Sequence, residues 1–134
     1  MGTIVKTIVL PIYYEQKFKT KKSKTFLVGL NWYRNAHHSI SNKVKHDYHE
    51  LVMKQCVSEE FHGKIKLHYR VYVARKNTDG SNIRSVIEKF LLDGLVEGGH
   101  INNDTIEYVV GDTSNYYQDK ENPRMEIDIE TVDN

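Results

Sequence analysis

Hydrophobic and polar positions alternate most clearly over residues 64–74. Every second residue is hydrophobic: Ile65, Leu67, Tyr69, Val71 and Val73. The residues between them are polar or aromatic: Lys66, His68, Arg70 and Tyr72. This period of two predicts a strand with one buried face. Residues 4–13 are rich in β-branched side chains and predict a second strand, in which Pro11 favours a sheet edge or a bulge.

Two segments show the spacing of amphipathic helices. The first is predicted over 42–57, with Ser41 as its cap and a buried side of Val44, Tyr48, Leu51, Val52 and Cys56. The second is predicted over 82–97, with Ser81 as its cap, Gly98-Gly99 as its end and a buried stripe of Ile83, Val86, Ile87, Phe90, Leu91 and Leu95. Cys56 is therefore expected in the core and not as a nucleophile.

Two further strands are expected after these helices, over 106–110 and 124–131. In the second, Met125, Ile127 and Ile129 alternate with acidic residues. The pattern predicts one domain over 1–134 of mixed α+β class, in which a single sheet of about four to five strands is packed by two main helices. The length of 134 residues suits one such core.

Composition narrows the class of protein. Hydrophobic residues make up 39% and charged residues 28% of the chain, as in ordinary globular proteins. No apolar run reaches the length of about 18 residues that spans a bilayer. The single cysteine, Cys56, cannot form a disulfide within the chain, which favours a reducing compartment. We therefore expect a cytoplasmic protein without a membrane partner.

The formal net charge of +1 hides a strong asymmetry along the chain. Residues 1–76 contain 12 Lys and 3 Arg against 5 acidic residues, whereas residues 77–134 contain 4 basic residues against 13 acidic ones. Proteins bind DNA through basic residues that neutralise nearby phosphates. A near-neutral net charge of the whole chain therefore does not exclude a DNA partner. Ordinary solvated surface charge is the alternative explanation.

Two segments of the basic half contain the candidate DNA contacts. Residues 17–24 form a basic turn or hairpin tip that contains Lys19, Lys21, Lys22 and Lys24. Residues 29–38 form an irregular segment of aromatic, amide and basic side chains, among them Asn31, Tyr33 and Arg34. Trp32 and Tyr33 suit stacking on unpaired bases, and equally suit ordinary packing under a loop.

A candidate metal site surrounds the second helix. Asn82, Ser85, Lys89 and Asp93 fall three or four residues apart on one helix face; Asp79 precedes the helix and Asp104 follows it. Carboxylates of this kind hold Mg²⁺ with its waters, and a lysine stabilises charge on a phosphate under attack. A surface ion pair between Lys89 and Asp93 and two ordinary loop carboxylates are the alternative.

The ordered set of these residues resembles the signature of RusA-like Holliday junction resolvases. The resemblance rests on Asp79-Gly80-Ser81-Asn82, Lys89, Asp93-Gly94-Leu95, Gly99 and Asn103-Asp104, with weaker likeness at 30–35 and 119–124. It implies a phage or prophage protein in a bacterial cell that resolves branched DNA. Ser81 and Asn103 stand where the family has aspartates, and the helix has about one extra turn before Lys89.

The resemblance implies a role for each matching residue. Asp79, Lys89 and Asp104 correspond to the catalytic group. Asp79 and Asp104, with Asp93, would hold Mg²⁺, for which Mn²⁺ can substitute. Asn82 and the segment that contains Asn31, Tyr33 and Arg34 would contact DNA. A homodimer is expected, since a four-way junction has two-fold symmetry. Two hypotheses follow: a Mg²⁺-dependent junction endonuclease, or a protein of the same fold that binds DNA or a protein partner without cutting, because Ser81 removes a ligand.

Overall fold

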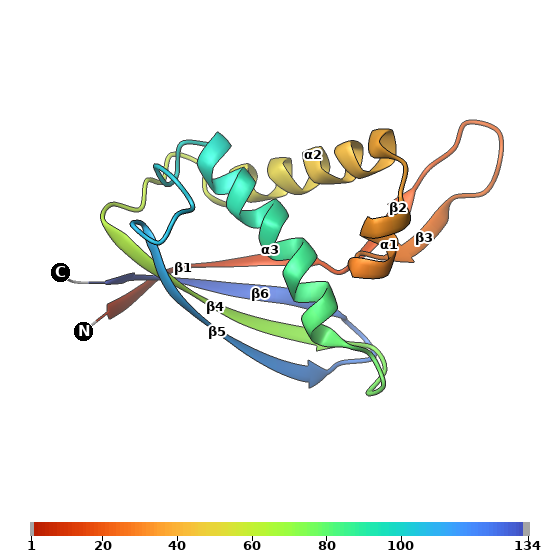
Figure 1. Ribbon diagram of the computed structural model, residues 1–134. Helices are drawn as coiled ribbons and strands as arrows, with labels where there is room; N and C mark the ends of the chain where they lie inside the picture. The colour runs from red at the N-terminus through yellow and green to blue at the C-terminus, as the bar shows by residue number, and fades with distance from the viewer. Residues whose placement is uncertain (1, 133–134) are drawn as a thin grey trace.

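The computed structural model describes residues 2–132, with the mixed α+β arrangement that the sequence predicts (Figure 1). The elements in chain order are β1 (Gly2–Pro11), β2 (Tyr13–Gln16), β3 (Lys24–Leu27), α1 (Leu30–Asn35), α2 (His38–Gln55), β4 (Lys64–Val73), α3 (Gly80–Glu97), β5 (Val109–Gln118) and β6 (Arg124–Val132). Within the described residues, no helix is long and apolar enough to cross a membrane.

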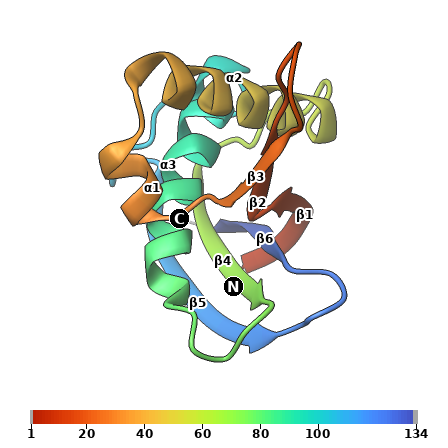
Figure 2. The ribbon, with the colours of Figure 1, turned by 90° about the vertical axis from the view of Figure 1, so that its right-hand side faces the viewer.

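Four strands form the main sheet in the order β1-β6-β4-β5. β6 pairs antiparallel with both β1 and β4, whereas β5 runs parallel to β4. A parallel neighbour needs a crossover connection, and α3 supplies it between β4 and β5. α2 and α3 lie on the same side of the sheet (Figures 1 and 2), so the sheet has one covered face and one open face.

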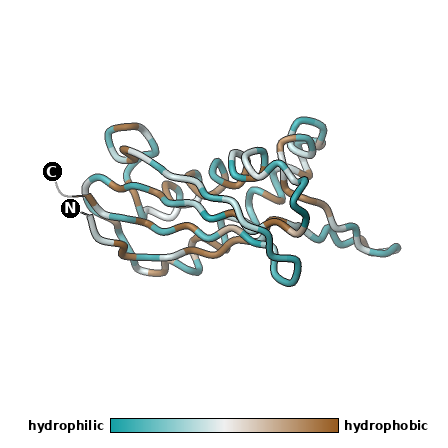
Figure 3. The backbone as a smooth tube through the Cα atoms, turned by 90° about the horizontal axis from the view of Figure 1, so that it is seen from below, coloured by the Kyte–Doolittle hydropathy of each residue, from teal (hydrophilic) through white to brown (hydrophobic). Residues whose placement is uncertain are grey.

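The core forms where the covered face meets α2 and α3. The alternation over 64–74 is confirmed, since Ile65, Leu67 and Tyr69 are almost completely buried and the residues between them are half-buried. Hydrophobic and hydrophilic positions alternate along the strands in Figure 3. Of the residues expected on the buried side of the first helix, all are buried except Leu51, which is half-buried. Cys56 lies in the core, and burial raises the pKa of its thiol to about 11.

Both long helices begin earlier than the sequence indicated, and with other caps. α2 starts at His38, and the ring nitrogen of His37 accepts the main-chain N–H of Ser39. α3 starts at Gly80, and the Asp79 carboxylate accepts the N–H of Ser81. The predicted caps at Ser41 and Ser81 were therefore wrong, because a residue upstream satisfies the first free N–H groups.

The segment between α3 and β5 differs most from the secondary structure that the sequence predicts. A strand was predicted over 106–110, but β5 covers Val109–Gln118 and residues 105–108 form a turn closed by the N–H of Tyr108 on the Thr105 carbonyl. β5 is an edge strand with mostly exposed side chains, so its residues lack the alternation by which a half-buried strand is recognised. The short helix α1 was likewise not predicted.

The β2–β3 hairpin projects from the body of the molecule (Figures 1 and 2) and is held at its base by aromatic packing. Tyr14 packs on Phe26 with ring centroids 5.6 Å apart, and Phe26 stacks on Trp32 of α1 at 5.0 Å. Tyr33 in turn meets Phe90 of α3 edge-on at 6.0 Å. These contacts join the hairpin, α1 and α3, and place the basic turn at one end of the molecule.

Candidate nucleic-acid interface

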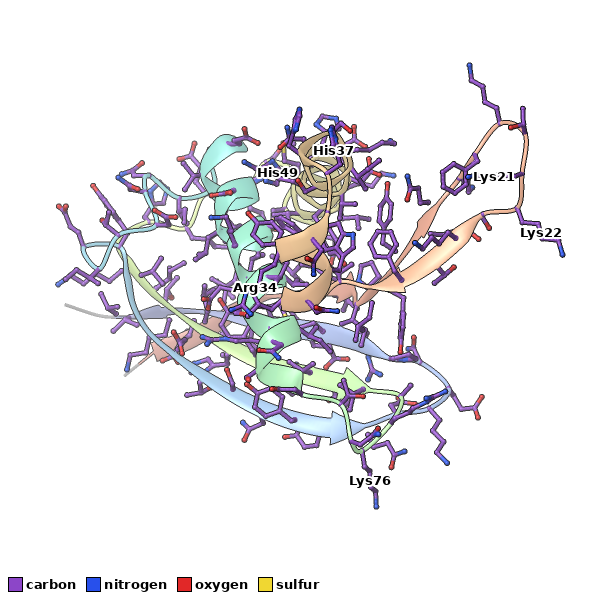
Figure 4. All side chains as sticks on the ribbon, turned by 45° about the vertical axis from the view of Figure 1, so that its right-hand side comes forward. Lys21, Lys22, Arg34, His37, His49 and Lys76 are labelled. Carbon is purple, nitrogen blue, oxygen red and sulfur yellow. The ribbon has the colours of Figure 1, made fainter. Side chains whose placement is uncertain are left out.

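The turn between β2 and β3 holds cations without acidic partners. Lys21 and Lys22 lie at the far end of the hairpin (Figure 4). Lys19, Lys21, Lys22 and Lys24 are all exposed, and no described residue forms a salt bridge with any of them. Lys21 lies over the Phe18 ring with its ammonium 4.5 Å from the centroid. The four predicted DNA-contacting lysines are thus brought together on one protruding hairpin, in which the acidic Glu15 pairs with Lys17 and not with them.

Two arginines of the open sheet face have carboxylate partners instead. Arg70 of β4 binds Glu126 at 3.1 Å and also contacts Asp128 of β6. Arg124 binds Glu126 at 2.8 Å and Asp119 at 2.9 Å. The hydrogen bonds from Arg70 hold the pKa of Asp128 below its usual value. Acidic residues from the second half of the sequence therefore neutralise these two arginines, whereas the four lysines of the hairpin have no such partner.

The α1 residues expected to contact DNA divide into two groups. Asn31 and Arg34 are exposed on the helix surface, and Arg34 forms no salt bridge with any part of the chain that the structure describes. Tyr33 is half-buried because its ring packs on Phe90. Asn35 donates its side-chain amide to the main-chain carbonyl of Asn31 at 2.7 Å. α1 therefore presents amides and one cation beside the hairpin, while Tyr33 contributes to packing.

Asp79 caps α3 and faces solvent. Its two carboxylate oxygens accept hydrogen bonds from the Ser81 hydroxyl at 2.7 Å, the Ser81 N–H at 3.1 Å and the Asn82 amide at 3.1 Å. The bond from the Ser81 side chain contributes most to lowering the pKa of Asp79. Ser81, which stands where the resembled family has an aspartate, here supplies a donor and not a second carboxylate.

The other candidate residues of α3 lie apart from Asp79. Lys89 is exposed on the helix, and the alternative pairing with Asp93 is not formed. Asp93 instead binds Lys45 of α2 at 3.5 Å, and so links the two long helices. Asp93 lies about 21 Å from Asp79 along the helix axis, because each residue rises about 1.5 Å. One ion cannot contact both carboxylates.

Asp104 lies at the opposite end of α3 from Asp79. It is exposed in the loop before β5, and that loop returns to the start of β4, where Val109 pairs with Ile65 (Figure 1). The 18 residues of α3 span about 27 Å between the two ends. No three His, Cys, Asp or Glu side chains among residues 2–132 are grouped so that they could hold a metal ion. The residues of a single chain do not fit the magnesium site that was expected.

Comparison with known proteins adds no family assignment. No protein-family model matches the chain, and no curated protein sequence matches it.

The fold also brings residues into this region that the sequence does not predict as part of a binding site. Gln16 and Phe26 of the hairpin, Asn35 of α1 and His37 line one hollow together with Asn31 and Trp32. The i, i+4 spacing of Asn31 and Asn35 would have placed both on one helix face, had residues 30–35 been recognised as helical. Their closeness to Gln16 depends on the hairpin folding back, which no local pattern encodes.

Proposed function

We propose that this protein binds branched or otherwise non-duplex DNA through the β2–β3 hairpin and the adjoining surface of α1. The observation that carries the proposal is the contrast between two sets of cations. Arginines of the sheet face and of α3 are held by carboxylates, whereas Lys19, Lys21, Lys22, Lys24 and Arg34 are exposed and, in the described part of the chain, have no acidic partner.

Free cations on a protruding element suit a polyanion. A lysine already paired with a carboxylate must lose that partner before it neutralises a phosphate, whereas an unpaired lysine releases only counterions from the DNA. Amides and aromatic rings beside the cations suit contacts with exposed bases, which branched DNA offers and a regular duplex does not. The predicted preference for branched over duplex DNA follows from this combination.

The proposal is tested by measuring the affinity of a labelled four-way junction against salt concentration. Replacing Lys19, Lys21, Lys22 and Lys24 with Ala should flatten the slope of log affinity against log salt by about 0.9 for each lysine that contacts a phosphate. A control variant removes positive charge from other exposed sites, for example Lys64→Ala with Lys120→Ala, and should leave the slope unchanged. An unaltered slope in the hairpin variant would exclude the hairpin as the DNA contact.

A second candidate function is metal-dependent cleavage of the bound junction. Its support is that Asp79, Lys89 and Asp104 are exposed and are not engaged in salt bridges with any described residue, whereas Asp93 is paired with Lys45. Because Asp79 and Asp104 lie at opposite ends of α3, one Mg²⁺ or Mn²⁺ could meet both only if Asp104 came from a second copy of the chain. Cleavage is therefore proposed together with the homodimer.

Mixing two inactive variants tests cleavage and the shared site together. Asp79→Asn and Asp104→Asn should each abolish cutting of a labelled junction in Mg²⁺ while retaining binding. If each site takes one aspartate from each copy, an equal mixture should regain about a quarter of the wild-type rate, since half of the dimers then hold one intact site. If wild type and Ser81→Asp both fail to cut any branched substrate, with Mg²⁺ or Mn²⁺, the nuclease proposal is wrong and the binding proposal is unaffected.

A further inference from the structure

A hollow of about 330 Å³ lies between the β2–β3 hairpin and the start of the helical layer. Gln16, Lys24 and Phe26 line it from the hairpin, and Asn31, Trp32 and Asn35 line it from α1. Gln16 and Lys24 are register partners in the hairpin, and Phe26 follows Lys24 by two positions, so these three side chains share one face of the ribbon. The size is at the lower end of the range of about 300–1,000 Å³ that small-ligand sites occupy.

One wall of the hollow is aromatic. Phe26 and Trp32 are stacked with centroids 5.0 Å apart and ring planes 20° from parallel. Both rings remain partly exposed although they pack against the core. The two rings hold each other in place, so the part of this pair that lines the hollow can pack against a planar ligand with little loss of entropy.

Side-chain amides beside the aromatic pair supply hydrogen-bonding groups. The Asn35 amide donates to the Asn31 carbonyl at 2.7 Å, and so fixes the side chain of Asn35. The same Asn35 nitrogen also donates to the Asn31 Oδ1 at 3.3 Å. The Asn35 Oδ1 remains an acceptor, and the side-chain amides of Asn31 and Gln16 contribute further donors. Side-chain amides with a donor beside an acceptor match the edges of nucleobases.

The charge of the hollow favours an anionic ligand. Lys24 lines it and supplies a positive charge, and no carboxylate lines it. Four other hollows of the described chain each contain at least one acidic side chain. His37 uses Nδ1 to bond Ser39, so Nε2 is the ring nitrogen that is left for a ligand. Aromatic, amide and cationic groups in one concavity are the combination that a nucleotide requires.

We propose that this hollow binds one unpaired nucleobase of a DNA strand, with the base against Phe26 and Trp32, its edge toward Asn31 and Asn35, and the adjoining phosphate near Lys24. The inference rests on the proposed DNA-binding function and names the part of the DNA that the protein reads. It also supplies a physical reason for a preference for branched DNA, since paired bases in a duplex cannot enter.

The fluorescence of Trp32 tests the hollow directly, because it is the single tryptophan of the chain. The protein is titrated with a short oligothymidylate and with an abasic oligomer of the same number of phosphates. The oligothymidylate should quench the emission and bind about tenfold more tightly, since stacking contributes about 1–3 kcal/mol per base. The abasic oligomer should bind with the same dependence on salt and leave the emission almost unchanged.

Two amide variants separate base recognition from charge. Asn35→Ala should reduce the ratio between the two affinities at least threefold without altering the salt slope, whereas Asn115→Ala on β5 should change neither. If both oligomers bind equally and the emission is constant while the junction still binds in a salt-sensitive manner, the base site is wrong and the DNA-binding proposal stands. If oligothymidylate quenches Trp32 but the junction does not bind better than a duplex, the base site stands and the preference for branches falls.

Discussion

The arginines of this protein differ in whether carboxylates of the same chain neutralise their charge. Arg70, Arg84 and Arg124 each bind two carboxylates, and their guanidinium groups support the sheet and α3. Arg34 belongs to the same residue type but lies exposed in the last turn of α1. A planar guanidinium with free donors suits phosphate contact, whereas one already paired adds only to stability.

Arg34→Ala should therefore weaken binding of a four-way junction about three- to tenfold at low salt, because one phosphate contact is lost. The melting temperature should stay within about 2 °C of the wild type, as is usual for an exposed surface substitution. Arg34→Lys is the matched control, since it keeps the charge and should retain the salt slope. Parallel losses of melting temperature and affinity would show that Arg34 serves packing.

The ion pairs of the sheet face predict a dependence of stability on pH. Arg70 lowers the pKa of Asp128 in the folded protein. As pH falls through about 4, the unfolded chain binds the proton first, so this contribution is present above that pH and is lost as pH falls through the folded pKa. Arg70→Met should flatten the free energy of unfolding between about pH 5 and pH 3, as measured with urea, whereas Lys120→Met should not. Curves of equal steepness for wild type and Arg70→Met would contradict the assignment.

At the scale of elements, a side chain of α2 covers part of the β1 edge of the main sheet. On β1, the Gln55 side chain of α2 accepts the N–H of Val9 and donates to its carbonyl, both at 2.8 Å. The Gln55 amide thus bonds both main-chain groups of Val9, as a neighbouring strand would. An irregularity in the β1 register between Ile4 and Lys6 also interrupts this edge. The main-chain groups of Val9 are therefore not available for pairing with another chain.

Gln55→Ala should lower the free energy of unfolding by about 1–2 kcal/mol, because two hydrogen bonds to the edge are lost. Urea denaturation measures the loss, and light scattering shows whether the exposed edge promotes association. Gln55→Glu retains the acceptor and loses the donor, so its stability should be intermediate near neutral pH. Equal stability of all three proteins would mean that water replaces the amide without cost.

At the scale of the whole molecule, the candidate binding element stands apart from the core. The turn over 17–23 is almost entirely exposed, and the hairpin is attached through the aromatic contacts of Tyr14 and Phe26 at its base. Surface segments of this kind tolerate replacement because little buried structure depends on them. Folding and DNA binding are therefore expected to be separable.

Replacing residues 17–23 with Asn-Gly, which closes a two-residue hairpin, should change the melting temperature by less than about 3 °C. The affinity for a four-way junction should fall by more than about tenfold at low salt, because several cations are removed together. Calorimetry and fluorescence anisotropy measure the two effects. A protein that fails to fold, or one that binds as before, would show that the two roles are not divided in this way.

The sequence alone determined the elements that have a repeating pattern. β4 was predicted within a residue because its side chains alternate between core and solvent, and both long helices were recognised from their buried stripes. The basic hairpin tip followed from its local run of lysines. These features depend on neighbours in the chain, so local spacing encodes them.

Tertiary structure alone decided how distant residues are placed. β5 is polar and becomes a strand only because β4 offers it a parallel edge. Asp79 and Asp104 had a plausible spacing in sequence, but the crossover through α3 places them at opposite ends of that helix. The hollow with Trp32 and Asn35 exists only because the hairpin folds against α1. The physical reason is the same each time: pairing between segments far apart in the chain sets distances that local periodicity does not contain.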